Sequence, residues 1–205
     1  MLAFKGATMR PLLLMALLVL AGCSQLHYSR VQTGELKGRL LVQWVSPDEF
    51  IFVPDPDPAQ RLTFTRANGD VITPGKMYTD GGSVPRFLWS IRGYSPWGYA
   101  PAFIVHDWLF DSHHCGDSPF PDYTNSDAAM VMSEIMKTMM EETGEKNAFV
   151  LYSTYEAVSS SIAQDLWDKG TCMRPELLNA ERRFMAAPVA PTYEIEWPPK
   201  PGPLR

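Results

Sequence analysis

In the first half of the chain the hydrophobic positions fall in short runs rich in β-branched and aromatic residues, which is the pattern of strands. Three such runs are residues 39–45, 49–53 and 61–65, and they are separated by turn residues and a proline-rich stretch. Between Thr65 and Val71, the pair Asn68-Gly69 predicts a hairpin with a type I′ turn, because both central positions need positive φ. We therefore expect a small antiparallel sheet.

In the second half the apolar positions recur at three- and four-residue intervals, which predicts helices. The three helical segments are residues 99–110, 126–142 and 145–169. Methionine and alanine form the inner stripe of the second segment, with Glu134, Lys137 and Glu141 outside. The third is expected to end at Gly170 and to turn Phe149, Tyr152, Tyr155, Val158, Ile162 and Leu166 inward. The predicted class is α+β: a small antiparallel sheet followed by a three-helix layer.

Prolines crowd the end of the chain and limit what it can form. They are residues 188, 191, 198, 199, 201 and 203. Because proline lacks an amide hydrogen and has a fixed φ, this density excludes helices and sheet interiors. We predict an extended tail over residues 185–205 and one α+β domain over residues 37–184.

The N-terminus has the order of a secretory signal. Lys5 and Arg10 precede the apolar run 11–21, which is too short to span a bilayer as a helix. The run ends in Leu-Ala-Gly-Cys, which resembles the bacterial lipobox. The resemblance implies cleavage after residue 22 and diacylation of Cys23, followed by a polar tether over residues 23–36. Ser24 resembles the residue that directs such proteins to the periplasmic face of the outer membrane.

The charge balance argues against nucleic acid as a partner. The chain has 18 basic and 23 acidic residues, a net charge of −5. Loss of residues 1–22 removes Lys5 and Arg10, which leaves 16 basic and 23 acidic residues and a net charge of −7. A negatively charged protein is repelled by a phosphate backbone.

After lipidation two cysteines remain, Cys115 and Cys172. An oxidising periplasm favours a disulfide between them. The alternative is a zinc site, because His113 and His114 adjoin Cys115 and His106 lies upstream. Successive residues point in different directions and rarely supply three ligands to one tetrahedral ion, so we favour the disulfide.

An adjacent pair, His106-Asp107, interrupts the apolar helical segment 99–110. Burying an imidazole and a carboxylate is costly unless each has a partner, so this pair is the candidate site. The two side chains leave a helix about 100° apart, so we expect different partners for them. For Asp107 we predict calcium, with Asp80 and the carbonyls of the glycine loop at 81–82 completing the ligands.

For His106 we predict Asp127 as the carboxylate that fixes the imidazole tautomer, with the pair acting catalytically. Each assignment has an alternative. Asp127 lies in the first turn of its helix, where an acid complements the helix dipole. Asp80 fits a turn residue that bonds nearby amides. His106 also fits a core histidine with satisfied hydrogen bonds.

The motif TDGGSVPR at residues 79–86, HDWLF at 106–110 and Ser126-Asp127 together resemble the domain of unknown function 1353 family of phages, prophages and bacterial envelopes. The resemblance covers roughly residues 41–142. It implies no activity, but it supports treating the three motifs as one unit.

A more distant likeness is to phospholipase A2-type enzymes, in which a glycine loop precedes a His-Asp helix and a later Asp. Gly81, Gly82, His106, Asp107 and Asp127 follow that order here, although the flanking cysteines are absent. The likeness implies that the loop and Asp107 bind calcium, and that His106, oriented by Asp127, activates water. The expected function is a calcium-dependent lipid acyl-ester hydrolase on a membrane-anchored lipoprotein, with phospholipid as substrate.

Two other readings stay open. Ser83 could act as a nucleophile with His106 as its base, although the strand-turn-helix elbow pattern is missing around it. Alternatively the protein is not an enzyme. His106, Asp107, Thr79 and Asp80 would then form a structural polar network, and the tail and tryptophans would contact an envelope protein or the cell wall.

Overall fold

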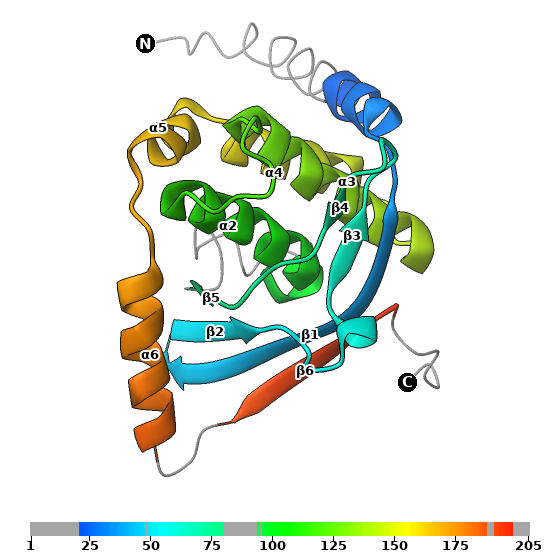
Figure 1. The fold of residues 1–205 in the computed structure, drawn as a ribbon. Coiled ribbons are helices and arrows are strands. Elements are labelled where there is room, and N and C mark those ends of the chain that lie inside the picture. The colour runs from blue at the N-terminus through cyan, green and yellow to red at the C-terminus, as the bar shows by residue number, and fades with distance from the viewer. Residues whose placement is uncertain (1–20, 48, 80–93, 95, 188–190, 199–205) are drawn as a thin grey trace, which may run out of the picture.

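The structure of the chain, a computed structural model, describes residues 21–47, 49–79, 94, 96–187 and 191–198 (Figure 1). Residues 21–30 are helical and are named here the N-terminal helix. The strands are β1 Glu35–Ser46, β2 Glu49–Val53, β3 Thr63–Thr65, β4 Val71–Ile72, β5 Met77–Thr79 and β6 Thr192–Trp197. The helices are α2 Ala100–Cys115, α3 Asn125–Thr143, α4 Ala148–Val158, α5 Ser161–Lys169 and α6 Arg174–Ala186. Short 3-10 turns lie at η1 Pro58–Gln60 and η3 Pro96–Tyr99.

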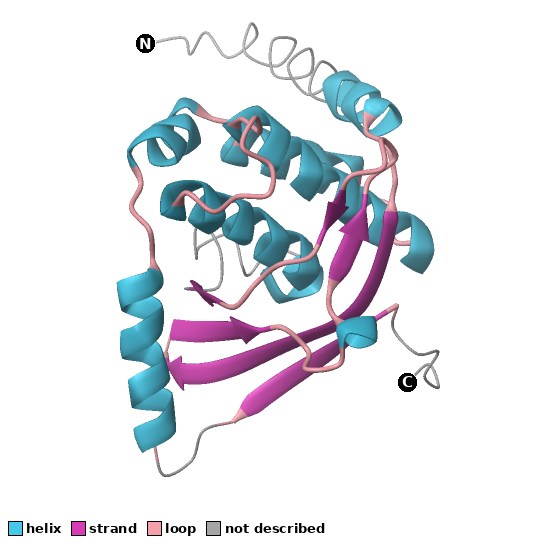
Figure 2. Cartoon of the chain, in the orientation of Figure 1, coloured by secondary structure: helices cyan, strands magenta, loops and turns pink. Residues whose placement is uncertain are grey.

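The strands form one sheet in the order β4-β3-β1-β2-β5, with β6 also paired to β1. Every strand pair is antiparallel. Figure 2 shows the sheet curling around the helices, with the long strand β1 as its spine. Gly38 lies in this strand at φ 102°, where an added Cβ would collide with the backbone of Arg61. The predicted α+β class and the single domain are confirmed.

The predicted hairpin joins β3 and β4, but its turn differs from type I′. Arg66 donates its amide to the Asp70 carbonyl at 2.9 Å, and Gly69 donates to the Arg66 carbonyl at 3.0 Å. Ala67 and Asn68 are therefore the central turn residues, and Gly69 takes the positive φ of 95°. A three-residue loop of this kind places glycine at a bulge position after the turn.

The core lies between the curled sheet and the helices α2 and α3. The largest fully buried side chains include Phe52 and Phe64 from the sheet and Leu109 from α2. From α3 come Met132, Met136 and Met140, each about 1% exposed. The methionine stripe is thus a core face, as its spacing predicts.

The third predicted helix, residues 145–169, is instead two helices. The chain breaks after α4, and the Ser160 side chain caps α5 by accepting the Ala163 amide at 3.3 Å. The break rotates the helical register of α5, so Ile162 and Leu166 are 74% and 55% exposed. Phe149, at the start of α4, is also exposed, at 52%. The prediction that these three point inward is wrong. Helix α6 was not predicted either, and the arrangement has more helices than a three-helix layer.

Part of the predicted tail belongs to the sheet. The six residues of β6 lie between Pro191 and Pro198 and contain no proline, so every one of them can donate an amide hydrogen. They pair with β1 from Gly38 to Gln43. The domain therefore extends past residue 184, and the prolines mark the ends of a strand.

Residues 23–36 are not a free tether in this structure. Lys137 donates to the carbonyls of Tyr28 and Val31 at 2.8 Å each, and the Tyr28 hydroxyl donates to Glu141 at 2.9 Å. Val31 is 3% exposed, and β1 begins at Glu35. The N-terminal helix is held against α3. Across the described residues, no helix has the length and apolar character needed to cross a membrane.

Candidate functional site

The His106-Asp107 pair lies in the middle of α2, opposite the end of β5. The His106 side chain is buried, and its Nδ1 lies 3.5 Å from Asp107 Oδ1. Asp107 Oδ2 accepts a hydrogen bond from Thr79 Oγ1 at 3.2 Å. We expected His106 and Asp107 to have different partners, but the two side chains contact each other, so that expectation is wrong. The side chains leave the helix 100° apart, but both are long enough to turn toward each other.

The other imidazole nitrogen is the unusual feature of the site. His106 Nε2 is buried and has no hydrogen-bond partner among the described residues. The ring packs against Phe110, with 4.8 Å between ring centroids. When Nδ1 carries the hydrogen and faces a carboxylate, Nε2 presents its lone pair. This is the protonation arrangement of a general base, and a buried unpartnered nitrogen is costly unless a ligand or water uses it.

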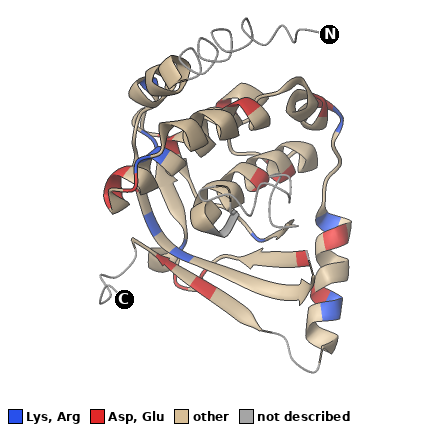
Figure 3. Ribbon diagram, turned by 180° about the vertical axis from the view of Figure 1, so that it is seen from behind, with Lys and Arg blue, Asp and Glu red and all other residues tan. Residues whose placement is uncertain are grey.

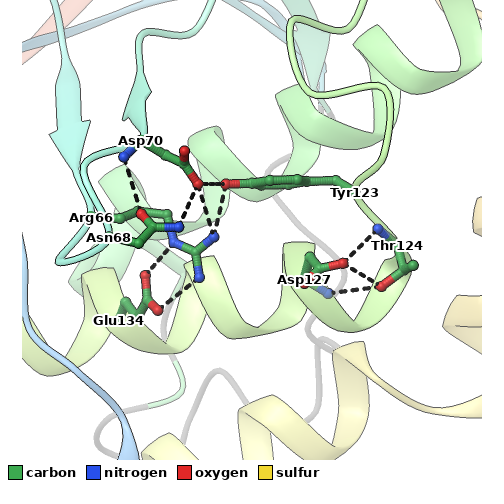
Figure 4. Close-up of polar contacts among 7 residues, drawn as sticks. All are labelled: Arg66, Asn68, Asp70, Tyr123, Thr124, Asp127 and Glu134. Atoms are coloured by element: carbon green, nitrogen blue, oxygen red, sulfur yellow. Dashed lines mark hydrogen bonds and ion pairs between the residues drawn. The ribbon is translucent and has the colours of Figure 1, made fainter.

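Asp127, predicted to orient His106, caps its own helix instead. Its Oδ2 accepts from the Thr124 amide at 2.8 Å and from the Thr124 hydroxyl at 2.6 Å (Figure 4). In return Thr124 Oγ1 accepts the Asp127 amide at 3.3 Å. This reciprocal pair is a capping box, the helix-end role that the sequence left open. Among the described residues, the carboxylate next to His106 Nδ1 is that of Asp107.

A substitution separates these two roles. We expect Asp127→Ala to lower the free energy of unfolding by about 1 kcal/mol, the usual contribution of a helix cap. Thr124→Ala should cost a similar amount because it removes the other half of the box. Urea unfolding followed by circular dichroism measures both. If Asp127→Ala left stability unchanged but altered the titration of His106 in NMR spectra, the capping assignment would fail.

The predicted metal ligands are only partly visible. Asp80, Gly81 and Gly82 lie outside the described residues, as does Ser83. Thr79, the residue directly before Asp80, donates a hydrogen bond to Asp107. Asp107, the predicted ligand that the structure describes, therefore lies next to the residue that precedes the other predicted ligands. The Asp107 side chain is 21% exposed, which leaves it accessible from one side. Calcium binding at Asp107 stays a prediction.

The predicted disulfide is present between Cys115 and Cys172. It joins the last residue of α2 to the segment before α6. His113 stacks on Trp167 at 4.1 Å between ring centroids, and His114 Nε2 lies 3.0 Å from the Leu166 carbonyl oxygen. The candidate zinc ligands thus have other contacts. The cluster of donor atoms found there, Asp111 with the two sulfurs, contains no free thiolate to bind zinc.

The sequence did not predict the ion network around Arg66 (Figure 4). Arg66 donates from Nε and Nη2 to Glu134 at 2.7 and 2.9 Å. Its Nη1 donates to the Tyr123 hydroxyl at 2.8 Å, and that hydroxyl donates to Asp70 at 2.6 Å. The hydrogen bond from Tyr123 lowers the pKa of Asp70. Burial, aided by the bond to Asp70, raises the pKa of Tyr123 to about 12.

This network is structural. It ties the β3-β4 hairpin to α3 and to the segment before α3. Glu134, expected on the outer face, is only 6% exposed, because Arg66 from the hairpin covers it. No local spacing pairs residues 68 positions apart, so the sequence carries no signal for this contact.

Comparison with known proteins identifies a family for the part of the chain that holds these groups. Comparison with curated proteins and with solved structures found no match. The sequence model of one family, described as protein of unknown function DUF1353, matches residues 59–153. That range includes β3 to β5, α2, α3, and both the His106-Asp107 pair and the Arg66 network. Residues 59–153 of the chain therefore match the DUF1353 family.

Proposed function

We propose that this chain is a lipid-anchored protein of the bacterial envelope, on the periplasmic face of the outer membrane, and that His106 serves hydrolysis of a phospholipid acyl ester. The observation that carries the catalytic part is the buried Nε2 of His106, which has no hydrogen-bond partner within the described part of the chain, beside the Asp107 carboxylate. The anchor rests on the lipobox-like sequence that ends at Cys23, whose side chain is exposed.

The chemistry follows from the hydrogen-bond order. Asp107 accepts the Nδ1 hydrogen of His106 and holds the ring, while Thr79 holds the other Asp107 oxygen. Nε2 takes a proton from water as the water oxygen bonds to the ester carbonyl carbon. The carbon–oxygen bond to the glycerol then breaks, and the imidazolium returns the proton to the departing oxygen. The products are a fatty acid and a lysophospholipid.

Calcium fits this scheme as a predicted cofactor. Asp107 is a hard oxygen ligand, and Asp80 with the carbonyls of Gly81 and Gly82 would supply further oxygens. Bound there, calcium would polarise the ester carbonyl. His106, held by Asp107, would transfer the proton with or without calcium.

The test is release of fatty acid from phospholipid vesicles by the purified protein. We expect His106→Ala to lower the rate at least about 100-fold, because a general base contributes this much or more. His113→Ala is the matched control in the same helix, since His113 stacks on Trp167 away from the site, and it should keep the rate. A chelator should abolish the reaction if calcium takes part. Absence of release by the native chain, or an unchanged rate in His106→Ala, would refute the catalytic role.

A second function is favoured by the Thr79 to Asp107 hydrogen bond, which links β5 to α2. In this case the pair is a structural network in a lipoprotein that binds an envelope protein or the cell wall. His106→Ala would then lower the melting temperature by several degrees, with no hydrolysis to lose. An enzyme would keep its melting temperature and lose its rate.

A further inference from the structure

The N-terminal helix leaves little slack between the proposed anchor and the domain. Val31, which is buried, lies eight positions after Cys23, and the chain between them is helical through residue 30. At 1.5 Å per residue the separation is about 12 Å. The helix is fixed at its end by Lys137 and by ring contacts of His27 with Tyr152 and Tyr155 at 5.6 and 4.5 Å. An acylated Cys23 would therefore hold one edge of the domain at the membrane surface.

Helix α5 presents an apolar stripe to solvent at that end of the molecule. Ile162 and Leu166 lie one turn apart, 74% and 55% exposed, while Ala163 and Trp167 face inward. Leu26 on the N-terminal helix is 49% exposed. Figures 1 and 3 show the N-terminal helix and α5 at one end of the molecule, and α6 with β6 at the other.

From these contacts we infer that Leu26, Ile162 and Leu166 rest in the interfacial layer of a phospholipid bilayer when Cys23 is acylated. The inference rests on the proposed anchor. An aliphatic stripe on a short helix is suited to burial at the boundary between headgroups and acyl chains. Helix α5 carries Asp165 and Asp168 but one base, Lys169, which pairs with Asp165, so its net charge is −1 and zwitterionic headgroups fit it better than anionic ones.

A matched pair of labels tests this orientation. Leu166 on α5 and Leu178 on α6 are 55% and 57% exposed, so Leu166→Cys and Leu178→Cys make comparable surface thiols. In the acylated chain, with Cys115 and Cys172 paired, the new thiol is the only free one among the cysteines of the sequence. Each variant is produced with its own leader, isolated from membranes and labelled with a nitrobenzoxadiazole dye. It is then placed in phosphatidylcholine and phosphatidylethanolamine vesicles with or without spin-labelled lipid.

We expect spin-labelled lipid to lower the emission of the dye at residue 166 by about twofold or more, because an interfacial side chain lies within reach of the label. The dye at residue 178 should keep its emission. Equal emission at both sites, or quenching at residue 178 alone, would overturn the inference and leave the anchor standing. The intact mass reports the anchor separately. A mass without acyl chains on Cys23 would overturn the anchor and this inference with it.

Discussion

Replacing Arg66 with methionine is expected to lower the free energy of unfolding by about 3–5 kcal/mol, because the change leaves the Glu134 carboxylate buried without its partner. The Glu134 side chain is 8% exposed and that of Arg66 is 12% exposed, so water cannot replace the lost ion pair easily. Two parallel hydrogen bonds join them, which is the strongest form of this contact. Urea unfolding of the variant and the native chain measures the difference.

The double variant Arg66→Met, Glu134→Met should recover much of the lost stability, since no charge is then left buried alone. Lys169→Met is the matched control. Its ion pair with Asp165 is 73% and 68% exposed, and removing it should cost less than about 0.5 kcal/mol. If Arg66→Met cost no more than Lys169→Met, the network would not be a buried one.

Local patterns predicted much of the fold because they report on single elements. The Asn68-Gly69 pair marked the hairpin, and the methionine spacing of α3 marked its buried face. Both depend only on residues close in sequence. The break between α4 and α5 was missed because the apolar spacing continues across Ser159 and Ser160, although serine is a common helix cap.

Contacts between distant segments could not be predicted in the same way. Strand β6 pairs with β1 about 150 residues earlier, and only the gap between Pro191 and Pro198 hints that a strand fits there. The N-terminal helix packs through hydrogen bonds from Lys137, which the sequence pattern predicted only to point outward from its helix. Such pairings are set by the assembled core.

At the candidate site, one prediction from the sequence agrees with the structure and another does not. The His106-Asp107 pair stood out because polar groups in an apolar helix need partners, and the structure places Asp107 beside both His106 and Thr79. The assignment of Asp127 to His106 was wrong for a readable reason. Thr124 lies three residues before Asp127, which is the spacing of a capping box, and that local use of the carboxylate prevailed.

Helix α2 contains the candidate site in its middle and Cys115 at its end. The disulfide from Cys115 to Cys172 connects this helix to the start of α6. Only Ala180 of α6 is buried. Its other contacts include a hydrogen bond from the Met173 amide to Asp111 at 3.0 Å and surface ion pairs, such as Lys76 with Glu181 at 2.8 Å and Arg183 with Glu49 at 3.0 Å. Exposed pairs contribute little to stability. The covalent bond at Cys172 is therefore the main restraint on the start of this helix.

Cys172→Ser is accordingly expected to lower the free energy of unfolding by about 4 kcal/mol. The bridge closes a loop of 57 residues, and the chain-entropy relation gives this magnitude for a loop of that length. Thermal unfolding with and without a reductant measures it: the native chain should fall to the stability of the variant when reduced, and the variant should not respond. Cleavage by trypsin at Arg182 and Arg183 should also become faster, since the helix loses its main restraint. A variant as stable and as resistant to trypsin as the native chain would mean that the packing of Ala180 and the surface pairs hold α6 on their own.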